Sequence, residues 1–326
     1  MGTGWDQVFA LDDAALGVFA AKGCGAPGSG PDRGRRAVNG NSVRVRRVLQ
    51  LTCDLCAGRD PKDLRILDLG CGDGVFSIEI GCRGADVVAI DGRDVRLSSG
   101  VDCAKRHELL NVHFEQRDVR EITRDTHGEF DVIYCLGILY HLDVPDLFTW
   151  LENLHAMCRQ NGCMIVDTEV APQLDDTASW RGHNYEGLRS REHDDAETPE
   201  ARRAKTFRSL DNTYNFLFGR EALVRLLHDV GFTTVMEVHA PIEPFKKPHR
   251  VTLAAIKGTP VRLSTYPWLN EHSEQELIAV LRPRITASAG PDGHVNRAAA
   301  SGLRQNVKQR AKKVLRRLGY EVRRVQ

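Results

Sequence analysis

The sequence predicts an α/β fold with a doubly wound, mostly parallel sheet. From Leu64 onward, short runs rich in apolar and β-branched residues alternate with stretches in which apolar residues have helical spacing. Glycines stand at alternate positions in "LDLGCGDG", at the end of the first run. The length of 326 residues suffices for one large α/β domain with additions. Strands that alternate with helices are typical of a parallel sheet with helices on both faces.

Residues 1–60 are predicted to form a helical cap before the sheet. "DDAALGVFAAKG" predicts a short helix, "GAPGSGPDRG" a loop, and "NSVRVRRVLQLTCDLCAG" a helix that begins at an Asn or Ser cap. Cys53 and Cys56 have the spacing of zinc ligands, but no second Cys or His pair accompanies them. We therefore expect no metal site.

Residues 61–258 are predicted to form the main domain. Its strands are expected in "LRILDLG", "ADVVAID", "VHFEQRD", "FDVIYCLG" and "CMIVDTEV". Residues 171–215 are polar and irregular in pattern, which is typical of an insertion or lid. The helix "GREALVRLLHDVG" and the strands "FTTVMEVHA" and "RVTLAAIKG" follow. A loop with two prolines joins these strands, so we expect them to pair antiparallel.

Residues 259–326 are predicted to form a helical C-terminal extension. Between Ser301 and Gln326 there are nine Lys or Arg residues and one acid, Glu321. This basic amphipathic segment could follow a phosphate backbone. Alternatively, its apolar stripe could dock on a domain or form an oligomer with a second subunit.

Charge and composition restrict the class of protein. The 45 basic and 44 acidic residues nearly cancel, so the whole surface is not adapted to a polyanion or a membrane. The first twenty residues do not resemble a signal peptide, and no apolar run approaches the ~18 residues of a membrane span. Nine cysteines without a secretory signal indicate reduced thiols. We expect a soluble, cytoplasmic protein.

The glycine turn indicates the kind of ligand. Its spacing is G-x-G-x-G instead of the G-x-G-x-x-G of dinucleotide sites, and an acid, Asp73, lies inside it. A carboxylate there would repel a pyrophosphate but not a cationic sulfonium. Asp68, Asp91 and Asp118 end successive strand-like runs. Three acids at these strand ends suit the amino group, ribose and adenine of S-adenosylmethionine.

These motifs resemble those of the class I S-adenosylmethionine-dependent methyltransferases. "LDLGCGDG", "AIDGR", "QRDV" and "FDVIYCLGILYHL" are similar to the family's first motif, second motif, third motif, and fourth strand with its loop. The resemblance implies a seven-stranded sheet of order 3-2-1-4-5-7-6 and S-adenosylmethionine as cofactor. It also implies a set of cofactor-binding residues: Asp68, Gly70, Cys71, Gly72, Asp91, Gly92, Arg93, Asp118, Val119, Leu136 and Gly137. For Asp118, a helix cap is the alternative.

The acceptor site is expected near the loop after the fourth strand, which contains the catalytic candidates Tyr140, His141 and Asp143. A hydroxyl or ammonium acceptor needs a base, and His141 is the first candidate because imidazole titrates near neutrality. Alternatively, His141 and Asp143 cap the next helix. Candidates for binding the acceptor are Asp167, Trp180, His183, Tyr185 and Tyr214, with surface decoration as the alternative reading.

The leading functional prediction is methylation of a small polar acceptor, in particular O-methylation of a natural product or sugar-containing metabolite. The alternative is a tRNA methyl or carboxymethyl transferase, because "GILYHLDVPDLFTWL" also resembles the loop of tRNA wobble-uridine carboxymethyl transferases and the C-terminal segment is basic. A non-catalytic protein that binds S-adenosylmethionine is the third class. DNA is not an expected partner, because the Asn/Asp-Pro-Pro-Tyr signature is absent.

Overall fold

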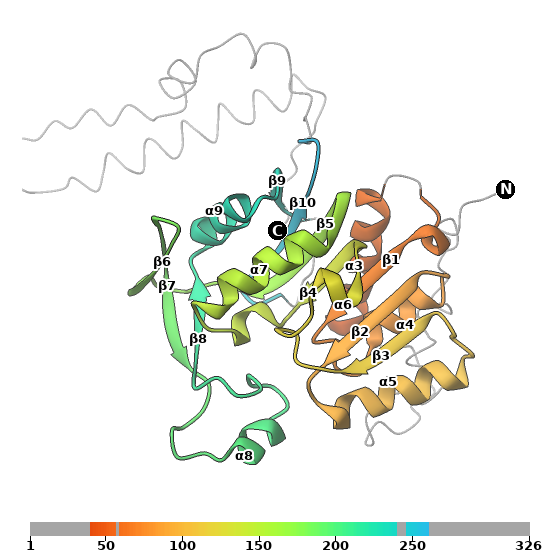
Figure 1. Ribbon diagram of the computed structural model, residues 1–326, viewed down its shortest axis with the longest axis horizontal. Helices are drawn as coiled ribbons and strands as arrows, with labels where there is room; N and C mark the ends of the chain where they lie inside the picture. The colour runs from red at the N-terminus through yellow and green to blue at the C-terminus, as the bar shows by residue number, and fades with distance from the viewer. Residues whose placement is uncertain (1–39, 57–58, 240–245, 261–326) are drawn as a thin grey trace, which may run out of the picture. The chain divides into compact units, whose positions relative to one another are not determined.

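The computed structural model describes residues 40–56, 59–239 and 246–260. Within them, seven strands form one sheet in the order β3-β2-β1-β4-β5-β10-β9 (Figure 1). Strands β1 to β5 pair in parallel, whereas β10 is antiparallel to β5 and β9. This topology confirms the predicted fold class and the antiparallel pair. The strands are β1 Arg65–Leu69, β2 Asp86–Asp91, β3 Val112–Gln116, β4 Phe130–Leu136, β5 Cys158–Glu169, β9 Thr234–Glu237 and β10 Arg250–Ile256.

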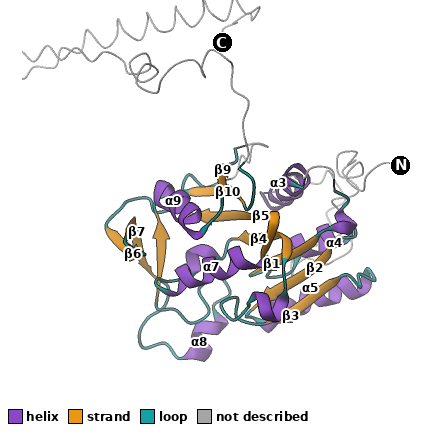
Figure 2. Cartoon of the chain, turned by 45° about the horizontal axis from the view of Figure 1, so that its top comes forward, coloured by secondary structure: helices purple, strands orange, loops and turns teal. Residues whose placement is uncertain are grey.

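Helices cover both faces of this sheet (Figure 2). Side chains alternate between the two faces of a strand, so each face of the sheet has its own core. Leu67 and Leu69 of β1 pack with residues of α7 and α9, whereas Ile66 packs with residues of α3 and α4. The helices are α3 Gly40–Leu55, α4 Val75–Gly81, α5 Asp94–Arg106, α6 Arg124–His127, α7 Asp146–Met157 and α9 Arg220–Val230, with short 3-10 helices at η2 Pro61–Asp63 and η3 Leu139–His141.

A second sheet corrects the prediction that residues 171–215 are irregular. Three antiparallel strands form it in the order β6-β7-β8, and a short helix lies between the last two. The elements are β6 Asp176–Trp180, β7 His183–Arg191, α8 Pro199–Ala204 and β8 Tyr214–Phe218. We call residues 171–218 the arm. Tyr185, Phe216 and Phe218 of the arm are fully buried in the core that contains α7 and α9. These buried aromatic residues therefore anchor the arm, although its strand β7 is mostly polar.

Some predictions fall on residues that the structure does not describe. The helix "DDAALGVFAAKG" and the extension beyond residue 260 lie outside the described residues. The domain boundaries at residues 60 and 258 therefore stay predictions. None of the helices in the described part of the chain has the length and hydropathy required to cross a bilayer.

Candidate cofactor and acceptor site

The glycine turn lies between the end of β1 and the start of α4. Gly70 and Gly72 have φ angles of 62° and 58°, which favour glycine over residues with a side chain. A Cβ atom on Gly72 would lie 2.9 Å from the Arg96 guanidinium. Between them, the backbone N–H of Cys71 donates to the carbonyl of Ile90 at 3.0 Å, which holds the turn against β2. The turn thus lies at the edge where the parallel strands end, and its conformation depends on glycine at both positions.

Asp91, at the end of β2, is fixed by two backbone N–H groups. Gly72 donates to Oδ2 and Arg93 to Oδ1, both at 2.9 Å. The side chain is nearly buried, at 7% exposure, so its carboxylate is oriented beside the glycine turn. Each carboxylate oxygen can accept a further hydrogen bond, which is what two ribose hydroxyls require.

Asp68 is a buried carboxylate that suits a cationic partner. Burial raises its pKa to about 7, and the hydroxyl of Ser77, which donates to Oδ2 at 2.6 Å, and the charge of Arg44 offset only part of this effect. An ammonium group close to it would favour the ionised form. A buried carboxylate whose pKa is raised therefore suits the ammonium group of a bound methionine moiety.

Asp118 has an additional role that the sequence did not indicate. Its carboxylate accepts from the backbone N–H of Arg120 at 2.9 Å and from the Arg120 guanidinium, which also pairs with Asp211 of the arm at 2.8 Å. Burial raises the pKa of Asp118, but the hydrogen bonds from Arg120 hold it below its usual value. The neighbouring Val119 is buried, and its carbonyl accepts from the indole of Trp150 at 2.8 Å. Contact of Asp118 and Val119 with adenine stays a prediction.

The arm lies directly against the second motif. The Arg93 guanidinium donates to the carbonyls of Arg203, Lys205, Arg208 and Ser209, at 2.7 to 3.1 Å. A Cβ atom on Gly92 would lie 2.8 Å from Leu210 Cδ2. Arg93 therefore fastens the arm at the end of β2. Nothing in the sequence pattern indicates this contact, because it joins segments about a hundred residues apart.

His141 lies in η3, just after β4, with its ring centroid 4.3 Å from that of Tyr140. Its Nδ1 atom lies 2.8 Å from Oε1 of Glu192, a buried residue at the end of β7. Asn215 Nδ2 donates to the same Glu192 oxygen at 2.8 Å. Sequence reasoning missed Glu192, whose only signal is that it is an acid within the inserted arm.

A cluster of charges surrounds Asp167 near the end of β5. Arg44 of α3 pairs with it at 3.1 Å and Lys246 at 3.4 Å, while Arg250 and Thr252 of β10 also donate to it. Burial raises the pKa of Asp167, but these cations hold it below its usual value. A Cβ atom on Gly137 would lie 3.1 Å from the Arg250 guanidinium, so this cationic cluster directly adjoins the end of β4. Asp167 thus pairs with cationic side chains of the protein itself. Its prediction as a ligand of the acceptor did not anticipate this role.

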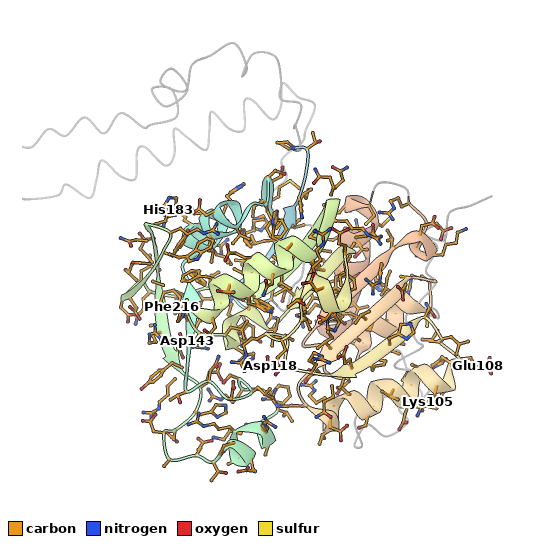
Figure 3. The ribbon with its side chains drawn as sticks, in the orientation of Figure 1. Lys105, Glu108, Asp118, Asp143, His183 and Phe216 are labelled. Atoms are coloured by element: carbon orange, nitrogen blue, oxygen red, sulfur yellow. The ribbon has the colours of Figure 1, made fainter. Side chains whose placement is uncertain are left out.

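Three predicted acceptor ligands lie at the far end of the arm. Trp180 stacks on Phe148 with ring centroids 5.3 Å apart, and His183 and Tyr185 both bond to Asp229 of α9. Strand β7 runs from His183 to Arg191, about 26 Å at ~3.3 Å per residue. Figure 3 shows His183 well apart from Asp118 and Asp143. This position does not support acceptor binding by the three residues.

Asp143 and Tyr214 lie at the near end of the arm. Both Asp143 oxygens accept from Arg189 of β7, at 2.7 and 2.8 Å. This carboxylate therefore links the loop between β4 and α7, which we call the β4 loop, to the arm. Helix α7 begins at Asp146 with Pro145 as its cap, so Asp143 does not cap it as the alternative reading proposed. Tyr214 is partly exposed and lies beneath Arg191, whose guanidinium carbon is 5.8 Å from the ring centroid.

Comparison with known proteins identifies the family. A family model described as a methyltransferase domain matches residues 43–237, more than half of the chain. The chain belongs to this methyltransferase family. The resemblance predicted from the motifs is confirmed, and with it S-adenosylmethionine as the cofactor of the methyltransferase domain. In the described part of this methyltransferase, no group of three His, Cys, Asp or Glu side chains is arranged to hold a metal ion.

Curated relatives of this methyltransferase include ubiquinone biosynthesis O-methyltransferases. The protein from Marinobacter nauticus is 37% identical over 109 residues, and that from Acinetobacter baumannii (strain AYE) is 29% identical over 104 residues. In both cases the match covers 32% of this chain and 43% of the relative. The chain therefore spans less than half the length of these relatives.

One solved structure shares most of the fold. The N-terminal domain of EvdMO1, crystallised in the presence of SAH and D-fucose, superposes with a TM-score of 0.53. The match covers 76% of this chain and 97% of that chain, at 19% identity. At this identity, the likeness shows the fold alone.

Proposed function

We propose that this methyltransferase transfers the methyl group of S-adenosylmethionine to a hydroxyl group of a small polar acceptor, such as a sugar-containing metabolite or natural product. The observation that carries the proposal is the position of the His141 imidazole. It lies in η3, after β4, and its Nδ1 atom contacts the buried carboxylate of Glu192. A hydroxyl acceptor requires removal of a proton, whereas a carboxylate acceptor does not. A positioned His therefore favours an acceptor that must lose a proton, such as a hydroxyl, over a carboxylate.

S-adenosylmethionine, when bound, supplies an electrophilic methyl group. Asp91 would accept from the ribose hydroxyls, Asp68 would pair with the methionine ammonium, and the cation of Arg44 would suit the methionine carboxylate. The backbone would approach the ligand closely at Gly70, Cys71, Gly72 and Gly137. Leu136 would lie beside the methionine moiety. Gly92, Arg93, Asp118 and Val119 would border the adenine.

The reaction is an in-line displacement. A lone pair of the acceptor oxygen forms the new O–C bond while the S–C bond breaks, and its electron pair stays on sulfur to give S-adenosylhomocysteine. The hydroxyl proton passes to Nε2 of His141. Tyr140, next to His141, and Tyr214, at the near end of the arm, would border the acceptor. Holding the two reactants in line accounts for much of the acceleration available to such a site.

The names of the relatives support a hydroxyl acceptor. The curated relatives are ubiquinone biosynthesis O-methyltransferases, and the EvdMO1 domain was crystallised in the presence of SAH and D-fucose. The alternative, tRNA modification, depends on the basic C-terminal segment, which lies outside the described residues, and stays a prediction.

The test combines cofactor binding with turnover. We expect calorimetry to show binding of S-adenosylmethionine to the full chain, and His141→Ala to leave that affinity within about two-fold of wild type. SAH formation should be measured with D-fucose and with a catechol as hydroxyl probes. Loss of a general base should lower kcat about 100- to 10,000-fold. Full turnover by His141→Ala would remove this residue from the mechanism, and failure of the wild type to bind the cofactor would overturn the whole proposal.

A further inference from the structure

Glu192 is the only buried carboxylate that the arm brings to the β4 loop among the described residues, and four groups fix it. Oε1 lies 2.8 Å from His141 Nδ1 and 2.8 Å from Asn215 Nδ2. Oε2 accepts from the backbone N–H of Ser209 at 3.2 Å and lies 3.9 Å from Arg208. Its side chain is 4% exposed. Such a complete set of partners fixes the position of both carboxylate oxygens.

The ionisation of Glu192 determines which nitrogen of His141 carries the proton. Burial raises the pKa of Glu192, but the hydrogen bond from His141 and the charges around it hold this pKa below its usual value. An ionised carboxylate can only accept hydrogen bonds. The proton shared across the 2.8 Å contact must therefore reside on Nδ1, and in the neutral imidazole this leaves the lone pair on Nε2.

We infer that Glu192 is the positioning residue of the proposed base: it fixes the Nδ1–H tautomer of His141 and pairs with the imidazolium that forms when Nε2 takes the proton of the acceptor. The inference rests on the proposed function, because it needs a proton acceptor at His141. The step requires no further reactant, since the proton moves from the hydroxyl to Nε2 as the O–C bond forms and the S–C bond breaks.

The arm holds the whole β4 loop, which explains how a distant acid can position the base. Three consecutive carbonyls of the loop accept hydrogen bonds from the arm: Tyr140 from Asn215 at 2.5 Å, His141 from Asn212 at 3.2 Å, and Leu142 from the backbone N–H of Phe216 at 3.0 Å. Ser209, whose N–H donates to Glu192, also provides one of the four carbonyls that bind Arg93. The pair formed by His141 and Glu192 is thus connected through the arm to the end of β2, where Asp91 is proposed to bind the ribose.

A spectroscopic test reads the tautomer directly. Full-length protein labelled with [15N]histidine and saturated with SAH is compared by two-bond 1H–15N NMR, with His141 assigned from the signals lost in His141→Gln. We expect the Nδ1–H tautomer in wild type and in Glu192→Gln, because the Gln carbonyl can still accept from Nδ1. Glu192→Ala should shift His141 toward the Nε2–H form that predominates in free imidazole side chains. An Nε2–H tautomer in wild type, or an unchanged spectrum in Glu192→Ala, would overturn the inference.

Kinetics separate positioning from a merely structural ion pair. With whichever of D-fucose or catechol supports turnover, Glu192→Ala should lower kcat about 10- to 1,000-fold, part of the effect of losing a general base, with cofactor affinity within about two-fold. Glu192→Gln should fall between Glu192→Ala and wild type. The matched control is Glu186→Gln, on the same strand, whose carboxylate forms an exposed ion pair with Arg225 and should leave kcat unchanged. Equal kcat in Glu192→Ala and wild type would contradict the inference.

The outcomes distinguish this inference from the proposed function. If the wild type binds no S-adenosylmethionine, the proposed function fails regardless of the tautomer. If it binds the cofactor and His141→Ala is inactive, but Glu192→Ala keeps the wild-type tautomer and rate, then only the role of Glu192 is refuted. If neither probe is turned over, the NMR comparison still decides between the two roles of Glu192.

Discussion

The edge of the large sheet at which Asp68 and Asp91 lie, here called the cofactor edge, holds its functional groups in a different way from the arm. At the cofactor edge, Asp68 and Asp91 are buried, and Asp91 is held by backbone N–H groups. In the arm, most charged side chains form exposed pairs, such as Glu186 with Arg225 of α9 and Arg191 with Asp195. Glu192 differs from these pairs, since it is buried and its partner His141 lies in η3, after β4. The comparison teaches that a site group can be recognised by burial and fixed partners, whichever region it comes from.

The largest expected effect concerns the cofactor edge. Asp91→Ala should weaken S-adenosylmethionine binding about 100-fold or more, because two hydrogen bonds to a carboxylate are lost at ~1.5 kcal/mol or more each. Calorimetry measures the affinity. The matched control is Asp94→Ala, which removes an exposed carboxylate three residues away and should leave the affinity unchanged. Equal affinity in Asp91→Ala and wild type would remove Asp91 from the cofactor site.

The sequence predicted the cofactor edge better than the arm, for a physical reason. The strands themselves and the positions of Gly70, Gly72 and Asp91 follow from local rules, namely apolar periodicity, turn glycines and strand ends, whereas the order of the strands was implied by the family resemblance. The arm depends on tertiary contacts. Its strand β7, "HNYEGLRSR", has only Tyr185 as a large buried side chain, so its pattern resembles a polar loop. Trp180, His183 and Tyr185 were assigned by composition alone, and composition does not tell which end of a strand faces a site.

The second prediction uses the raised pKa of Asp68. Unfolded Asp ionises near its ordinary value of ~3.9, whereas the folded carboxyl retains its proton up to about 7. The folded state therefore binds more protons between these values, and its stability falls as pH rises from about 4 to 7. Asp68→Asn removes this penalty while keeping an oxygen that can accept from Ser77. We expect the apo variant to gain a few kcal/mol at most over wild type at pH 8 and almost nothing at pH 4, as measured by denaturant unfolding.

Cofactor binding should respond to Asp68 in the opposite direction. Because the ammonium group of the methionine moiety favours the ionised carboxylate, the affinity of wild type for S-adenosylmethionine should rise as pH increases through about 7. Asp68→Asn should bind more weakly and lose this pH dependence. A wild-type affinity that is flat between pH 6 and 8 would contradict the assignment of Asp68 to the methionine ammonium.

The third prediction tests the attachment between the two regions. Arg93→Met removes the hydrogen bonds to the carbonyls of Arg203, Lys205, Arg208 and Ser209. If the variant loses about 1.4 kcal/mol of the free energy that keeps the arm attached, the population of the open arm should rise about ten-fold. Limited proteolysis between residues 194 and 209 should accelerate accordingly, since cleavage follows the population of the opened form. Arg225→Met, which removes the α9 partner of the exposed Glu186, should leave cleavage of this segment unchanged.

The smallest effect is expected at the far end of the arm, where the Tyr185 hydroxyl donates to Asp229 Oδ2 at 2.7 Å. Tyr185→Phe keeps the buried ring and leaves Asp229 its contact with His183, so unfolding should become easier by only about 1 kcal/mol. Since this end of β7 lies about 26 Å from the end near His141, kcat and KM should not change. A rise in KM with unchanged stability would instead show that the acceptor reaches this end of the arm, which would restore the prediction that Tyr185 binds it. The two readouts together therefore decide whether Tyr185 anchors the arm or contacts the acceptor.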